Sequence, residues 1–139
     1  METEFSIYDK NFIMIDRLLL HINVLIQPGL PFFPLYAYID NNYDMHVNLI
    51  PLDEGEEIDF EVMRQNQLDK LNQQLEKQEI FSFAIACDCF TTNNNKTVNS
   101  ISILVMNQQK VHSGHVLYDY KISKSKSFEI SNYREEDLE

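Results

Sequence analysis

The sequence predicts an α+β fold in which a single antiparallel sheet of about five strands carries two helices, in the order α-β-β-α-β-β-β. Two segments repeat apolar residues every three or four positions, which is helical spacing, and five others are short apolar or alternating runs typical of strands. Short polar connections join the strand segments and favour antiparallel neighbours. We therefore expect one sheet with both helices on the same face.

The first predicted helix covers residues 9–26, and Asp9 is placed to cap its start. Its apolar stripe follows steps of three and four and consists of Phe12, Ile15, Leu19, Ile22 and Ile26. Further apolar residues widen this stripe, so we expect the helix to be buried on much of its circumference, against the sheet or against another copy of the protein. Two prolines and a glycine within 27–31 end it.

A β-hairpin is predicted over residues 32–52. Aromatic and aliphatic residues run from 32 to 40, and apolar and polar residues alternate from 46 to 52. Between them, residues 41–44 read Asn-Asn-Tyr-Asp, which is turn chemistry.

The second predicted helix covers residues 60–78. It follows the stretch 53–61, which has six acidic residues and no basic one, and acidic residues at a helix start are favoured by the helix dipole. Leu68, Leu71 and Leu75 mark one face, while Gln, Asn and Lys occupy most of the rest. We expect this helix to be amphipathic and half exposed.

Three further strands are predicted over 81–90, 100–106 and 116–122. The first carries small residues on one face, which suggests a closely packed helix and a central position in the sheet. Residues 123–139 suggest another edge strand, followed by an acidic tail over 134–139 that frays. Without repeats or a linker, residues 1–139 are expected to form a single domain.

Composition narrows the functional classes. The 139 residues carry a formal net charge of −11, which disfavours nucleic acid and anionic membrane surfaces as partners, because both require clustered Lys and Arg. The chain shows no leader pattern and no apolar run of membrane-spanning length. We expect a cytoplasmic protein.

No set of residues predicts a catalytic site, a metal site or a cofactor. A serine-nucleophile elbow, a calcium-binding loop and a phosphate-cradling glycine loop are all missing from the sequence. Cys87 and Cys89, together with His112 and His115, make a Cys2His2 site geometrically conceivable. However, a Cys-x-Cys pair on a regular strand spaces its sulfurs awkwardly for one tetrahedral ion, so a core role for the two cysteines is favoured.

The acidic stretch and the aromatic run before and within the first strand predict a protein-binding surface. Its charge favours a protein partner with a basic surface, and aromatic side chains are frequent interface anchors. The residues that we expect to contact this partner are Asp53, Glu54, Glu56, Glu57, Asp59, Phe32 and Tyr36.

The run Phe33 to Asp40 resembles a hairpin motif, Phe-x-Pro-x-x-Ala followed by Asp, of small, acidic, uncharacterised bacterial proteins. The likeness covers roughly residues 20–110, and no activity follows from it. It departs from that pattern at residues 41–44, where the glycine expected after the Asp is replaced. In size, charge and α+β content the chain also resembles bacterial immunity proteins, and its element order resembles the roadblock/longin-like dimerisation folds.

We therefore expect a non-catalytic, cytoplasmic protein-binding module of immunity type that uses an acidic surface. One alternative is a homodimeric structural or adaptor protein of roadblock-like element order, built from the first helix and an open sheet edge. The other is a small ligand binder or enzyme with a pocket near the first hairpin, close to Tyr36, Tyr38, His112 and His115.

Overall fold

A computed structural model describes residues 7–25, 34–50, 59–93, 95–108, 113–122 and 128–137. Their helices and strands are α1 (Ile7–Leu25), β1 (Leu35–Asp40), β2 (Met45–Leu49), α2 (Phe60–Glu76), β3 (Ile80–Asn93), β4 (Lys96–Asn107), β5 (Gly114–Ile122) and β6 (Phe128–Asp137). The α+β class and the predicted order of elements are confirmed. The described sheet has six strands, one more than the expected five.

Every strand is antiparallel to its neighbours, in the order β2-β1-β3-β4-β5-β6. Strands β3 to β6 follow one another as a meander, whereas β1 lies between β2 and β3. Helix α2 leads from the first hairpin into this meander. The predicted hairpin is confirmed, and β3 has the predicted position inside the sheet.

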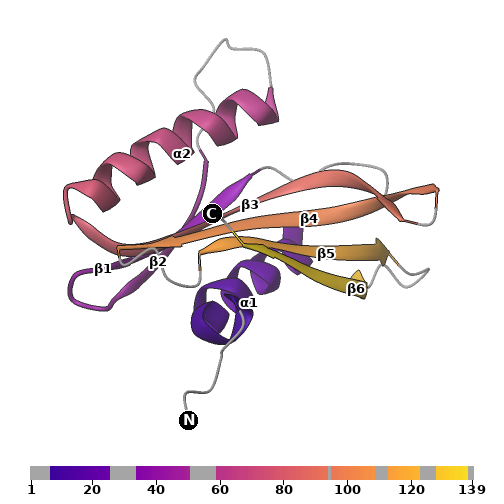
Figure 1. Cartoon of the computed structure of the whole chain (residues 1–139), viewed down its shortest axis with the longest axis horizontal. Coiled ribbons are helices and arrows are strands. Elements are labelled where there is room, and N and C mark those ends of the chain that lie inside the picture. The colour runs from indigo at the N-terminus through magenta and orange to yellow at the C-terminus, as the bar shows by residue number, and fades with distance from the viewer. Residues whose placement is uncertain are drawn as a thin grey trace.

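The prediction that both helices lie on one face is wrong. Figure 1 shows α1 on one side of the sheet and α2 on the other. The reason lies in the alternation of β1 and β3, which place apolar residues on both faces. Small or branched residues, such as Ala84 and Ala86, pack with α1, whereas Phe83 and Ile85 pack on the α2 side.

Helix α1 contacts all six strands and packs its buried side into the main core. Its backbone leaves helical geometry at Asn11. Beyond that kink the side chains that are almost completely buried against the sheet are Met14, Ile15, Leu18 and Ile22. In the described part of the chain, neither helix has the length and apolar character needed to cross a membrane.

Residues 134–137 belong to β6 and do not form the frayed tail that the sequence suggested. They pair with β5 from Leu117 opposite Arg134 to Gly114 opposite Asp137. Residues 138–139 lie outside the described part. The predicted edge strand is therefore present, and it extends further than its apolar residues indicate.

Candidate functional site

Two neighbouring strands present an aromatic ladder to the α2 side of the sheet. Tyr36 and Tyr38 are two residues apart on β1, so their side chains share a face, and their ring centroids are 6.3 Å apart. Tyr38 also stacks on His46, its cross-strand partner on β2, with centroids 4.6 Å apart. Tyr36 and Tyr38 form a floor beneath one side of α2, and the His46 ring continues this floor onto the edge strand β2.

Asp40 fixes the outer end of this floor. One carboxylate oxygen lies 2.9 Å from Nε2 of His46, and the other accepts hydrogen bonds from the backbone N–H groups of Asn42 and Asp44. The hydrogen bond with His46 is the main reason that the pKa of Asp40 lies below its usual value, and the backbone bonds contribute in the same direction. The turn thus holds the His46 ring against Tyr38.

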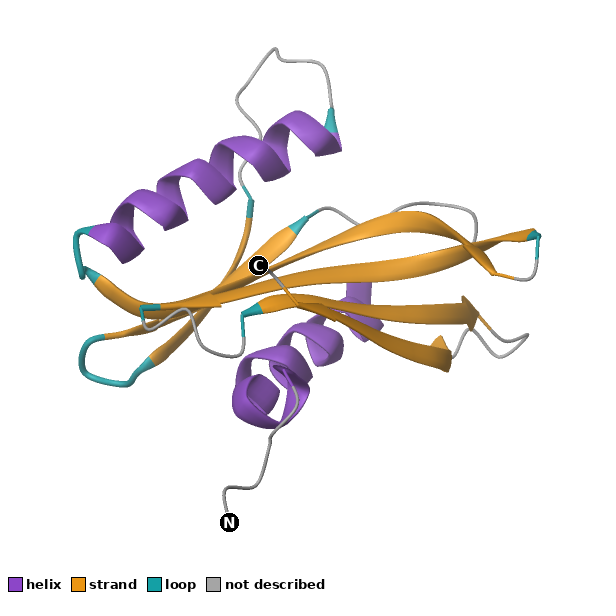
Figure 2. Ribbon diagram, viewed as in Figure 1, coloured by secondary structure: helices purple, strands orange, loops and turns teal. Residues whose placement is uncertain are grey.

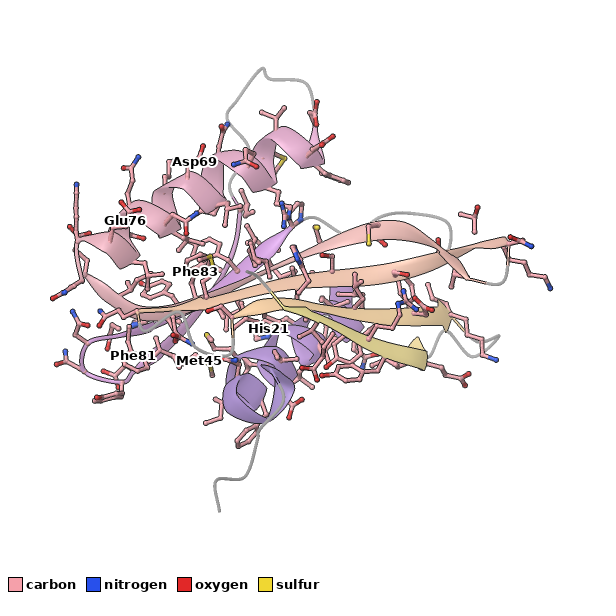
Figure 3. All side chains as sticks on the ribbon, in the orientation of Figure 1. His21, Met45, Asp69, Glu76, Phe81 and Phe83 are labelled. Carbon is pink, nitrogen blue, oxygen red and sulfur yellow. The ribbon has the colours of Figure 1, made fainter. Side chains whose placement is uncertain are left out.

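Helix α2 forms the wall of the site. It is anchored to the sheet by apolar side chains such as Leu71 and Leu75, and Gln67 is buried beside them. Helical spacing brings Lys70, Gln73, Gln74 and Lys77 to one side of this anchoring face. Asp69 and Glu76, labelled on α2 in Figure 3, do not line the groove.

Between wall and floor lies a groove with a volume of about 520 Å³. We call it the α2 groove and define it by its lining residues, which are Tyr36, Tyr38, Gln67, Lys70, Gln73, Gln74, Lys77 and Glu79. Its size is within the range of small-molecule sites, which is about 300–1,000 Å³.

The charge of the α2 groove differs from that of the chain as a whole. The chain has a net charge of −11, but the groove has two lysines and one glutamate. Within the described part of the chain, neither Lys70 nor Lys77 has an ion-pair partner. Burial, followed by the neighbouring Tyr38, raises the pKa of Tyr36, and a side-chain hydrogen bond with Asn48 acts in the opposite direction.

A side-chain hydrogen bond ties the hairpin turn to the far end of α2. Asn41 Nδ2 donates to the carbonyl oxygen of Gln78 over 2.6 Å, just beyond the helix end. Gln78 has a φ of 60°, in the left-handed region that reverses the chain into β3. Both segments lie at the left of Figure 2, and their connection fixes one end of the groove.

The predicted partner-binding residues fall into three groups by their location. Phe32, Asp53, Glu54, Glu56 and Glu57 lie outside the described residues. Tyr36 lies in the α2 groove. Asp59 is the N-cap of α2, where Oδ1 accepts hydrogen bonds from the backbone N–H groups of residues 61 and 62, each 3.1 Å long.

His115, one of the two histidines predicted to lie near the hairpin pocket, does not line the α2 groove. His115 is on β5, separated from β1 by β3 and β4, and His112 lies outside the described residues. The groove near Tyr36 and Tyr38 is instead completed by residues of α2. The sequence did not predict this, because Lys and Gln on an amphipathic helix are typical of an ordinary solvated face.

Cys87 and Cys89 are free thiols, each partly buried on the α2 face of β3. Burial is the main cause that raises the pKa of both thiols, to about 11 for Cys89. Thiols of this kind are weak nucleophiles at neutral pH. Among the residues that the structure describes, no group of three or more His, Cys, Asp or Glu side chains is arranged to hold a metal ion.

An ion pair with a buried carboxylate, which the sequence did not predict, connects β5 and β6. Asp119 accepts hydrogen bonds from both terminal nitrogens of Arg134, at 2.7 and 2.9 Å, and from Ser100 Oγ at 2.7 Å. The carboxylate side chain is 1% exposed. These groups satisfy one another, so we interpret the cluster as structural rather than as a ligand site.

The comparisons with known proteins give no relative for this chain: no family model, no curated protein and no solved structure matches it. Function therefore has to be inferred from the chemistry of the described residues.

Proposed function

We propose that this protein is a binding module that takes up a compact anionic ligand with a planar ring in the α2 groove. The observation that supports this most is the combination of an aromatic floor with two lysines that lack ion-pair partners within the described residues. The net charge of −11 repels an anion at long range. The attraction of the groove for an anion therefore has to come from the two lysines beside it.

Each part of the groove matches one part of such a ligand. The tyrosine rings provide π-faces for stacking. Lys70 and Lys77 are seven residues apart, so they follow one side of α2 with an axial separation of roughly 10 Å. The amides of Gln73 and Gln74 offer both donors and acceptors between them.

A binding role fits the described chemistry better than a catalytic one. The groove contains phenols, amides, lysines and a carboxylate, and neither cysteine lines it. Both thiols have a raised pKa, which opposes their use as nucleophiles.

The proposal is tested by isothermal titration with naphthalene-1-sulfonate, an anionic planar probe, and with its neutral sulfonamide. The wild type is compared with the double variant Lys70→Ala/Lys77→Ala. Each exposed charge contact contributes about 0.5–1 kcal/mol, so the double variant is expected to bind the sulfonate about tenfold more weakly. Its affinity for the neutral sulfonamide should change little.

The matched control is Lys96→Ala/Lys121→Ala, which removes the same charge from exposed positions on β4 and β5. It should keep the sulfonate affinity within about twofold of the wild type. Equal losses in the two double variants would show a general charge effect and contradict the proposal. Failure of the wild type to bind either probe would also contradict it.

The hypothesis of a basic protein partner stays a prediction alongside this one. Four of its acidic residues, from Asp53 to Glu57, lie outside the described residues. The carboxylate of Asp59 is engaged in capping α2, so its contribution to a partner surface would compete with a structural task.

A further inference from the structure

The two cysteines of this chain lie together on one face of the sheet. Cys87 and Cys89 are two residues apart on β3, so their side chains point to the same side. This is the side on which Ile85 packs under α2. The pairing of β3 with β4 is regular here, and the residues opposite the two cysteines are Ser102 and Ser100. We call Cys87 and Cys89 the thiol pair.

The start of α2 lies next to the thiol pair rather than over it. The first turn of the helix packs through Met63 on Ile85 and Leu104, and the two cysteines follow Ile85 by one and two steps along the same face of β3. Figure 1 shows β3 and β4 continuing beyond this end of α2. Both thiols are only partly buried, so a small ion can reach them.

Arg64 brings a positive charge to the thiol pair. It lies near the start of α2 and makes a side-chain hydrogen bond with Cys87. Burial is the largest influence on the pKa of Cys89 and raises it, whereas the charges of Arg134 and Arg64 act in the opposite direction. Arg134 is already paired with Asp119, but Arg64 forms no ion pair within the described residues. Its charge is therefore left to balance a negative charge on the two sulfurs.

The spacing of the thiol pair suits a metal ion with two ligands on opposite sides. Residues i and i+2 are roughly 6.6 Å apart along a strand, and side chains that lean together bring their sulfurs closer than this. Two sulfur ligands of tetrahedral zinc have to approach to roughly 3.8 Å, because each zinc–sulfur bond is about 2.3 Å long. A linear arrangement keeps the sulfurs further apart and distorts the strand less. Thiolates select soft ions such as Cu(I), which accepts two ligands in a line.

We propose that Cys87 and Cys89 bind one Cu(I) ion between their sulfurs, with Arg64 beside the complex as its counter-charge. One monovalent ion replaces two thiol protons, so the complex carries one negative charge, which the guanidinium offsets. Two ligands complete such a site. It therefore agrees with the absence, among the described residues, of a metal-binding group of three or more His, Cys, Asp or Glu side chains.

Anaerobic titration with Cu(I), in competition with the chelator bicinchoninate, tests this proposal. The wild type should retain one Cu(I) per chain. Because the ion needs both sulfurs and the chain has only these two cysteines, Cys87→Ser and Cys89→Ser should each lower the affinity by about a hundredfold or more. A wild type that retains no copper, or a loss in only one of the two variants, would overturn the proposal.

The wild type itself provides a measurement that does not depend on how a substitution affects folding. X-ray absorption of the protein loaded with one equivalent of Cu(I) should show two sulfur ligands and no nitrogen or oxygen ligand. A first shell that contains nitrogen or oxygen would contradict the two-thiolate site.

A charge substitution tests the role of Arg64. Arg64→Gln should weaken Cu(I) binding by about tenfold, because the complex loses its counter-charge. Arg17→Gln is the matched control, since it removes the same charge from an exposed position on α1, on the other face of the sheet, and it should leave the affinity unchanged. Equal losses in the two variants would overturn the role of Arg64. Neither cysteine lines the α2 groove, so the failure of either proposal leaves the other intact.

Discussion

The carboxylate of Asp119 shows how single residues hold this sheet together. It is 1% exposed, and a charge this deeply buried is tolerated only when its hydrogen bonds are satisfied. Ser100 on β4 and Arg134 on β6 supply those bonds from the two strands beside β5. Through this one residue, side-chain bonds connect three neighbouring strands.

Replacing Arg134 by Met is therefore expected to destabilise the protein by about 3 kcal/mol, because it leaves the buried carboxylate without its counter-charge. The free energy of unfolding, measured in urea, checks this. The companion variant Arg134→Met/Asp119→Asn should recover part of the loss, since it also removes the buried charge. Equal stability of Arg134→Met and the wild type would show that the ion pair is not structurally important.

The sequence pattern makes Asp119 noticeable but does not indicate that Arg134 is its partner. Asp119 interrupts the apolar run of a strand, and such an interruption reads as a residue on the polar face of the sheet. Its partner Arg134 lies 15 residues later, in a segment whose composition suggests a frayed tail. In the β5–β6 ladder Arg134 lies opposite Leu117 and Asn132 lies opposite Asp119, so Arg134 is the diagonal neighbour of Asp119. The local sequence pattern does not define this pairing register.

At the level of elements, the position of α2 depends on how the helix begins and ends. Asp59 caps its first turn, and the bond from Asn41 to the carbonyl of Gln78 secures the chain just beyond its end. The helical periodicity predicted α2 to within two residues. It did not predict which side of the helix borders the groove, because Gln67 is buried among apolar residues despite its polar amide.

The substitution Asp59→Ala is expected to lower the free energy of unfolding by about 1 kcal/mol, because two backbone N–H groups of the first turn lose their acceptor. Asp59→Ser should retain most of the stability, since serine also caps helices. Thermal and urea denaturation of the two variants make the comparison. If both variants lose the same stability, the negative charge of Asp59 rather than its capping bonds is what matters.

The placement of the two helices on opposite faces of the sheet also follows from a single element, strand β3. Strand β3 alternates small side chains with large ones, and the sequence pattern predicts that a helix covers the small face. That face does receive a helix, namely α1. The large residues on the other face, such as Phe83, shown between α2 and the sheet in Figure 3, require their own cover.

For the whole molecule, the sheet separates helix α1 from the α2 groove. The groove therefore lies on the face of the sheet opposite α1 (Figure 1). The pocket near Tyr36 and Tyr38 was one of the alternatives raised by the sequence. The lysines that line its α2 side could not be predicted, because the order of elements does not define how α2 packs beside β1.

The most direct test of ligand binding in the α2 groove is a map of where naphthalene-1-sulfonate binds, obtained from backbone amide chemical shifts during a titration of the wild type. We predict that the largest changes cluster on β1 around Tyr36 and Tyr38 and on α2 from Gln67 to Lys77. Shifts that cluster instead on α1 or on β4 to β6, with the groove unaffected, would contradict the assignment of the α2 groove as the binding site.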